Sequence, residues 1–147
     1  MKTNSIFLLL LLSFLTLTSC EDYDDYNEDR PTVVGFVGSE TSDSSDPSSL
    51  APGESAEITA FLFASDLSTS QRSFAIELDS AENELTEDNV SFDTQVVFPA
   101  NERNAEITVT ITNNSLTTTP ELLVLKLVTD PSYVVGERLR VSASSAE

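Results

Sequence analysis

Few side chains in this sequence could carry out covalent or acid–base chemistry. The chain has no histidine and one cysteine, Cys20, so an imidazole base, a Ser-His-Asp arrangement and a zinc site built from cysteines and histidines are excluded. Its four glycines are scattered, which leaves no phosphate-binding loop. Carboxylates are the remaining catalytic material, and one short stretch holds four of them: Glu82, Glu84, Glu87 and Asp88.

These four carboxylates could catalyse a reaction only if two of them faced each other across a cleft, as glycoside hydrolysis requires. They share one acidic segment, residues 80–89, which is bounded by alternating strand patterns. A single solvated loop in a small domain rarely forms a cleft, so we interpret this segment as an exposed loop. We therefore expect the protein not to be an enzyme.

Cys20 lies in a pattern that indicates a different chemistry. It follows an apolar run at residues 6–17 and the short sequence Leu17-Thr18-Ser19. A run of about 12 residues is too short to span a bilayer but suits a signal peptide. The pattern resembles the bacterial lipoprotein signal. That resemblance implies cleavage before Cys20, a diacylglyceryl thioether on its sulfur, and acylation of the new amine with a fatty acid such as palmitate. A structural cysteine beside a conventional cleavage site is the alternative.

The sequence divides into a lipoprotein signal peptide at residues 1–19, a lipidated cysteine and acidic tether at 20–31, and a folded domain at 32–147. Residues 21–29 contain six acids in nine positions. They have too few aliphatic side chains to form a core, so we expect them to be disordered. An acidic run directly after the cysteine also resembles the surface-export tag of certain Gram-negative lipoproteins. It implies a location on the outer membrane, facing the cell exterior. A plain spacer is the alternative.

The charge of the chain limits its partners. The formal net charge is -18 at pH 7, which repels phosphate backbones and anionic lipid. Nucleic acid is thus excluded as a partner, and membrane attachment is expected through the Cys20 lipid alone.

The folded region predicts an all-β domain. Turn residues separate about seven strands, which we expect at residues 32–37, 57–63, 73–79, 90–98, 106–112, 121–129 and 136–143. Strict alternation puts Phe74, Ile76 and Leu78 on one face of their strand, and for the same reason we expect Ile107, Val109 and Ile111 to point inward from residues 106–112. Residues 57–63 are expected to be buried on both faces, and the phenylalanines in strands are expected in the core. This spacing is typical of a two-sheet sandwich.

Residues 96–114 and 121–127 carry a further resemblance. A strand ending in Phe98-Pro99, a charged hairpin, an alternating strand, the turn Asn113-Asn114 and a long apolar strand follow in that order. This order resembles the Calx-beta domain, which implies an immunoglobulin-like Greek-key sandwich used as a calcium-binding or spacer module. The implied calcium ligands are Asp88, Glu121, Asn113 and Asn114. The two asparagines replace the family's Asp-Asp pair, and Asn101 replaces its hairpin glycine.

Two weaker signals concern partners. Leu122, Val124 and Val128 form a second apolar face on their strand, which is either covered by loops or a contact surface for a protein. Asp79-Ser80-Ala81 resembles an O-glycosylation motif of exported bacterial proteins, with an ordinary loop serine as the alternative. Stacking on sugars finds little support, since the chain has no tryptophan.

Together these features predict a membrane-anchored, non-catalytic binding or accessory module, with an unidentified envelope protein or glycan as its partner and no cofactor. A calcium-dependent adhesive Calx-beta-type module is the alternative function.

Overall fold

The computed structural model describes residues 30–38 and 49–146. The predicted signal peptide, Cys20 and residues 21–29 of the acidic tether lie outside the described residues. The described residues form nine strands and one short 3₁₀ helix: β1 (Thr32–Val37), β2 (Ser55–Ala64), β3 (Arg72–Leu78), η1 (Glu87–Asn89), β4 (Val90–Phe92), β5 (Gln95–Phe98), β6 (Asn104–Thr112), β7 (Glu121–Leu127), β8 (Tyr133–Val135) and β9 (Leu139–Ala143). The all-β prediction is confirmed.

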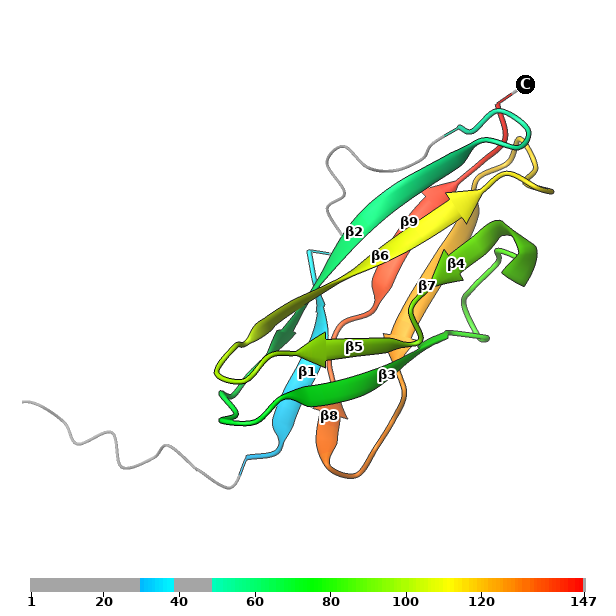
Figure 1. Cartoon of the computed structure of the whole chain (residues 1–147). Helices are drawn as coiled ribbons and strands as arrows, with labels where there is room; N and C mark the ends of the chain where they lie inside the picture. The colour runs from blue at the N-terminus through cyan, green and yellow to red at the C-terminus, as the bar shows by residue number, and fades with distance from the viewer. Residues whose placement is uncertain (1–29, 39–48, 147) are drawn as a thin grey trace, which may run out of the picture. The chain divides into compact units, whose positions relative to one another are not determined.

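The strands form two sheets that pack face to face as an immunoglobulin-like sandwich (Figure 1). The first sheet has the order β4-β6-β2-β1-β8, and the second has the order β5-β3-β7-β9. Neighbouring strands are antiparallel, except that β1 and β8 run parallel. The longest pairing joins β2 to β6 from Ser55–Thr112 to Phe63–Asn104.

The core lies between the sheets because alternate side chains of each strand point inward. In β6, Ile107, Val109 and Ile111 are buried, as the strict alternation predicted. In β3, Phe74 and Ile76 are buried and Leu78 is half-buried. The Phe74 ring packs edge-on against Phe98 at 5.4 Å between ring centroids. Apolar contacts between the sheets are therefore the main source of stability in this region.

The single strand expected at residues 90–98 is wrong, because the chain changes sheets in the middle of it. β4 pairs with β6 in the first sheet, and β5 pairs with β3 in the second. The crossing occurs at Asp93 and Thr94, both exposed, and the carbonyl oxygen of Thr94 accepts a hydrogen bond from the N–H of Ile76. Apolar alternation continues through both halves, so the sequence does not mark the crossing.

β8 was not expected from the sequence, and two glycines explain how it fits. Gly136 follows β8 and lies against Gly35 of β1, where the N–H of Gly136 donates to the carbonyl oxygen of Val34. A Cβ atom on Gly35 would come within 2.6 Å of the backbone nitrogen of Glu137. The approach of the two segments thus requires glycine at position 35.

Candidate functional site

The outer face of the first sheet carries exposed apolar side chains that no layer of the described residues covers. We call this surface the apolar face, and it comprises Val33, Val37, Phe61, Phe63 and Val134, each between 40% and 54% exposed. Strand register brings them together, since Val37 lies opposite Phe61 and Val33 lies opposite Val134. A shallow hollow of about 300 Å³ lies among Val33, Phe63 and Glu137.

The apolar face corrects two expectations. Residues 57–63 are not buried on both faces, because β2 alternates strictly between buried and exposed positions. Phe61 and Phe63 point outward and are not core residues, whereas Leu62 between them is fully buried. A strand with apolar residues on both faces is compatible with burial on both sides or with an exposed patch. The sequence does not distinguish these cases.

Polar side chains border the two rings. Glu106 of β6 lies opposite Phe61 in the strand register, and the exposed threonines Thr59 and Thr108 lie opposite each other two positions along. The apolar face therefore has its aromatic rings on β2, at the margin next to the hydroxyl and carboxylate groups, and its valines on β1 and β8.

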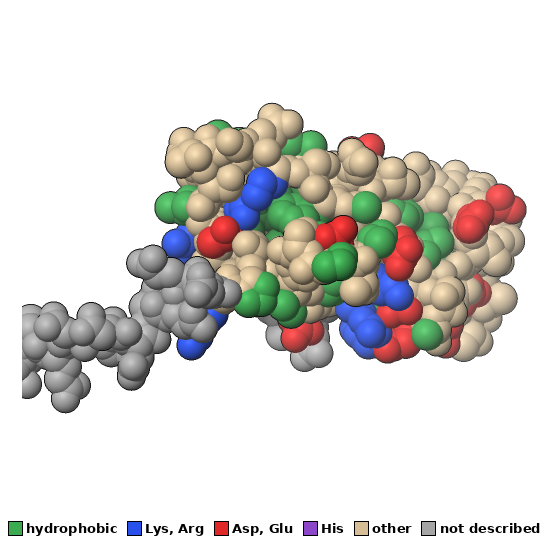
Figure 2. Space-filling model, turned by 90° about the horizontal axis from the view of Figure 1, so that it is seen from below, with side chains coloured by type: hydrophobic (Ala, Val, Ile, Leu, Met, Phe, Trp, Pro, Cys, Tyr) green, Lys and Arg blue, Asp and Glu red, His purple; other side chains and the backbone are tan. Residues whose placement is uncertain are grey.

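The outer face of the second sheet is different, because ion pairs lie over it. We call these six residues the ion-pair network: Lys126, Arg138, Arg140, Glu77, Asp79 and Glu82. Arg138 approaches Asp79 to 2.8 Å, and Lys126 lies 3.5 Å from both Asp79 and Glu77. Glu82 binds Arg138 and Arg140 through its two oxygens. Figure 2 shows basic and acidic side chains lying beside one another on the surface.

Asp79 is the buried anion of this network, with 2% of its surface exposed. A hydrogen bond of 3.2 Å from the backbone N–H of Ala81 lowers the pKa of Asp79, and the positive charges of Arg138 and Lys126 lower it further. Burial acts in the opposite direction but does not overcome these interactions. Asp79 is thus held as a carboxylate that ties β3 to β7 and to the segment before β9.

The predicted partner surface Leu122, Val124 and Val128 lies on this second face. Val124 is fully buried, and its backbone N–H donates to the side-chain oxygen of Asn83 at 3.2 Å. The N–H of Leu122 likewise donates to Glu84 at 2.9 Å. Leu122 and Val128 are half-buried. The loop after β3 therefore lies along β7, so only Leu122 and Val128 are left as candidates for contact with a partner.

The four expected calcium ligands lie around the β6–β7 turn and at η1, and three of them, Asn113, Asn114 and Glu121, make side-chain hydrogen bonds. Asn113 is buried and donates from its amide to the carbonyl of Leu50 at 2.8 Å and to Ser145 at 2.9 Å. The amide of Asn114 donates to the backbone oxygen of Asp88. Glu121 accepts from the N–H of Thr117, 2.9 Å away.

The amide hydrogens of the two asparagines thus point at neighbouring oxygens. In a metal site, the cation itself would lie against those oxygens. The structure brings Asn114 to Asp88, while Asn113 and Glu121 bind other groups. Within the described residues no cluster of three or more histidine, cysteine, aspartate or glutamate side chains has the geometry of a metal site. Calcium stays a prediction that depends on carbonyl and amide oxygens.

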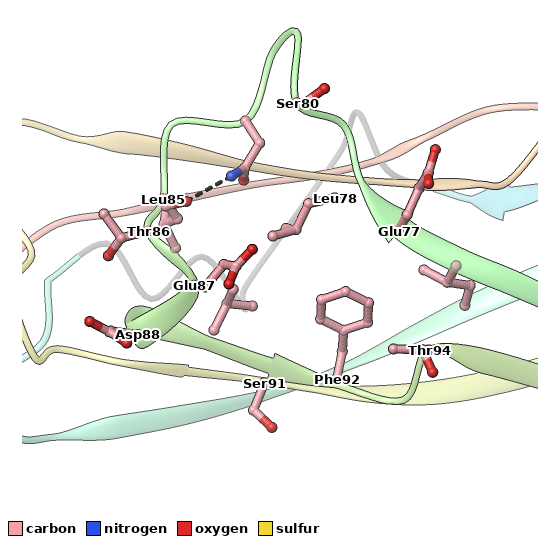
Figure 3. A pocket seen from close by; sticks show the side chains of 13 residues that line it. Glu77, Leu78, Ser80, Leu85, Thr86, Glu87, Asp88, Ser91, Phe92 and Thr94 are labelled. Atoms are coloured by element: carbon pink, nitrogen blue, oxygen red, sulfur yellow. Dashed lines mark hydrogen bonds between the residues drawn. The ribbon is translucent and has the colours of Figure 1, made fainter.

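The carboxylates of the acidic loop separate into different environments. Glu82 belongs to the ion-pair network, Glu84 holds Leu122, and Glu87 and Asp88 are exposed beside a groove between β3 and β4. The groove encloses about 1040 Å³ (Figure 3). Ser80, the predicted glycosylation position, is exposed at its rim, and its modification stays a prediction.

Comparison with known proteins identifies the fold. No protein-family model and no curated protein match the sequence. A multidomain protein including a DUF1735 domain from Bacteroides ovatus is similar in structure, with a TM-score of 0.55 and 15% identity over 77% of this chain and 45% of that chain. A proposed carbohydrate-binding protein from the same species has a TM-score of 0.51 and 12% identity over 69% and 34%.

A third solved structure, a Bacteroides ovatus protein of unknown function, has a TM-score of 0.50 and 17% identity over 78% of this chain and 46% of that chain. This chain spans less than half the length of each of the three. At identities this low, the structural similarity shows a shared β-sandwich fold and nothing more. In the part of the chain that the structure describes, no helix is long and apolar enough to cross a bilayer.

Proposed function

We propose that the chain is a lipid-anchored, non-catalytic binding module of a bacterial envelope and that the apolar face is its binding surface. One observation carries this proposal: five large apolar side chains are exposed together on one sheet, while the other carries ion pairs and a fully buried Val124 on its outer side. Burying an exposed Val or Phe side chain is worth about 1.5–3 kcal/mol, so a partner gains much by covering this face.

A protein or a further domain is the partner that this surface fits best. Aromatic residues within an apolar patch are enriched at protein contact sites. Each of the three similar solved chains is more than twice as long as its matched region. A sandwich of this kind can therefore lie beside further polypeptide, which supports an accessory role for this chain.

Photo-cross-linking on intact cells tests the proposal. We expect a cross-linking amino acid at position 37 of the full chain to give one reproducible adduct, which Phe61→Ser should abolish. Leu67→Ser is the matched control, because Leu67 is 56% exposed and lies outside the apolar face. An adduct that persists in Phe61→Ser, or that disappears equally in Leu67→Ser, would refute the assignment of the apolar face.

Carbohydrate is a second candidate ligand. Phe61 and Phe63 point to the same side of β2, two positions apart, and Thr59 and Glu106 supply polar groups beside them. The fold likeness to a proposed carbohydrate-binding protein is consistent with this candidate. Binding of the purified chain to envelope polysaccharide, lost in Phe63→Ala and kept in Leu67→Ser, would favour carbohydrate over protein.

The anchor rests on the sequence pattern at Cys20. Labelled fatty acid should enter the wild-type chain and not Cys20→Ala. Protease added to intact cells should degrade the β-sandwich, because we place it on the outer leaflet. Survival of the sandwich under this treatment would contradict the outward orientation without affecting the anchor.

The calcium-dependent Calx-beta-type module is the alternative function. A ligand bound only by the native state must raise the melting temperature, so calcium should stabilise the chain if Asp88 and Asn114 help to bind it. An unchanged melting temperature at millimolar calcium would remove this alternative. Magnesium at the same ionic strength is the control.

A further inference from the structure

The groove between β3 and β4 is the place where the sandwich is open. β5 pairs with β3 only as far as Ala75, whose partner is Gln95. The residues before β5 form β4, which pairs with β6 in the first sheet. Beyond Ala75, β3 therefore has no partner strand on this side, and Leu78 of β3 and Phe92 of β4 face a shared space. Figure 3 shows both side chains pointing into the gap between their strands. The groove encloses about 1040 Å³.

Backbone groups at the groove lack a neighbouring strand. The N–H of Ile76 donates toward β5, to Thr94, whereas the N–H of Asp79 donates toward β7, to Val124. Because backbone groups alternate in direction along a strand, the N–H and C=O of Leu78 point to the groove side. β4 is the edge strand of the first sheet. Two strand edges therefore border one groove, and open edges are where added strands pair.

The wall of the groove is apolar and continuous with the core. Leu78, Val90 and Phe92 are half-buried and pack against the buried cluster, and Leu85 beside them is 3% exposed. The core thus reaches solvent here. An extended segment presents every second side chain to one side, so its alternate apolar residues could pack on this wall.

The ionisable residues that line the groove are all acidic, although one of them, Glu77, pairs with Lys126 of the ion-pair network. Glu77, Glu87 and Asp88 are the ionisable residues that line it, with no lysine or arginine among the lining residues. A cationic partner is favoured by this rim.

Charge also disfavours the acidic segments of this chain as the ligand. Residues 21–29 contain six acids and no base, and residues 39–48 contain three acids and no base. A second copy, with a formal net charge of -18, is repelled as well. A basic segment of a different polypeptide fits the charge of the groove better.

We propose that the groove binds an extended basic segment of another polypeptide, which adds to the sandwich as a further strand and packs alternate apolar side chains against Leu78 and Phe92. This site is separate from the apolar face, which lies on the outer side of the first sheet. Either surface can fail its test without the other.

A synthetic peptide of alternating lysine and valine, about ten residues long, tests the proposal. We expect it to bind the purified full chain, with NMR shift changes at Leu78 and in β4. A peptide of alternating glutamate and valine should not bind. A version of the lysine peptide with N-methylated backbone amides, which loses its strand hydrogen bonds, should not bind either.

Two pairs of exposed carboxylates supply matched variants. Glu87→Gln with Asp88→Asn removes two rim charges and should weaken the binding of the lysine peptide about fivefold to tenfold. Glu57→Gln with Glu102→Gln removes two exposed charges outside the groove lining and should leave the affinity unchanged. Both pairs are exposed, so both variants should fold.

Hydrogen exchange gives a second readout. In the free protein the amide of Leu78 should exchange faster than those of Glu77 and Asp79, and the lysine peptide should slow it. The proposal is overturned if Leu78 is already protected in the free protein. It is equally overturned if the N-methylated peptide binds as tightly as the lysine peptide, if the shift changes fall on the apolar face, or if no binding occurs at millimolar peptide.

Discussion

The two outer faces of this sandwich have similar strands and different surfaces. β2 carries Phe61 and Phe63 on its outer side, and β7 carries Leu122 and Val124 on its own. Phe61 is 54% exposed, whereas Val124 is fully buried. One difference is the loop after β3, because residues 79–84 continue along β7 and bind its backbone at Val124 and Leu122.

This comparison shows that an apolar outer face is not by itself a binding surface. At β7 the Val124 side chain is fully buried within the domain, and residues 79–84 bind the strand beside it. At β2 the described residues supply no such cover. The uncovered face is therefore the one that can gain free energy from a partner.

The largest expected effect comes from placing serine at an equivalent apolar position on each of the two faces. Val124→Ser should destabilise the domain by about 2–4 kcal/mol, because it removes buried methyl groups and buries a hydroxyl. Phe61→Ser should change stability by about 0.5 kcal/mol or less. Thermal and urea unfolding of both variants measure this. Similar losses at the two positions would abolish the distinction between the faces.

Asp79→Asn should lower the melting temperature at neutral pH by less than Val124→Ser. The asparagine keeps a hydrogen bond to Ala81 and loses both ion pairs. Since folding lowers the pKa of Asp79 below 3.8, its contribution is present above that value and is lost as the pH falls through the folded pKa.

Melting temperatures from pH 7 down to pH 2 check the sign of this effect. The wild type and Asp79→Asn should converge at the acid end. Curves that stay parallel would mean that the Asp79 carboxylate does not stabilise the second face.

A dye that binds exposed apolar surface should distinguish the faces without a large change in stability. The wild-type domain should bind the dye, and Phe61→Ser with Phe63→Ser should bind clearly less. Leu67→Ser, a change of similar exposure elsewhere, should retain most of the signal. Equal dye fluorescence in all three proteins would mean that the apolar face is not a continuous surface.

The smallest effect is expected from Arg140→Gln. Arg140 and Glu82 are each 38% exposed, and exposed ion pairs contribute about 0–1 kcal/mol. Denaturant unfolding should therefore show little change. A loss as large as that of Val124→Ser would show that Arg140, and not the loop, buries Val124.

Much of the fold was predictable because strand alternation reports which side chains face inward. Phe74, Ile107 and Val109 were placed correctly for this reason. The crossing at Asp93 was not, because the apolar pattern continues on both sides of it. β8 was missed because three residues give too short a pattern.

The candidate site was less predictable, because alternation places a side chain on a face but does not tell which groups lie over that face. In the sequence, Phe61 and Val124 are both apolar residues at alternate positions of a strand. The contacts that distinguish their surroundings join residues about forty positions apart, such as Asn83 with Val124. The groove depends on where β5 stops pairing with β3, which no local signal marks. Cys20 and the calcium ligands remain predictions from resemblance.

Thiol labelling of the full chain on intact cells tests the central claim most directly. Phe61→Cys lies on the apolar face, and Val97→Cys lies on β5 at similar exposure, 47% against 54%. A membrane-impermeant maleimide should label position 97 and leave position 61 protected on cells, while both should react in the purified protein. Equal labelling of the two positions on cells would show that nothing covers the apolar face and would contradict the account.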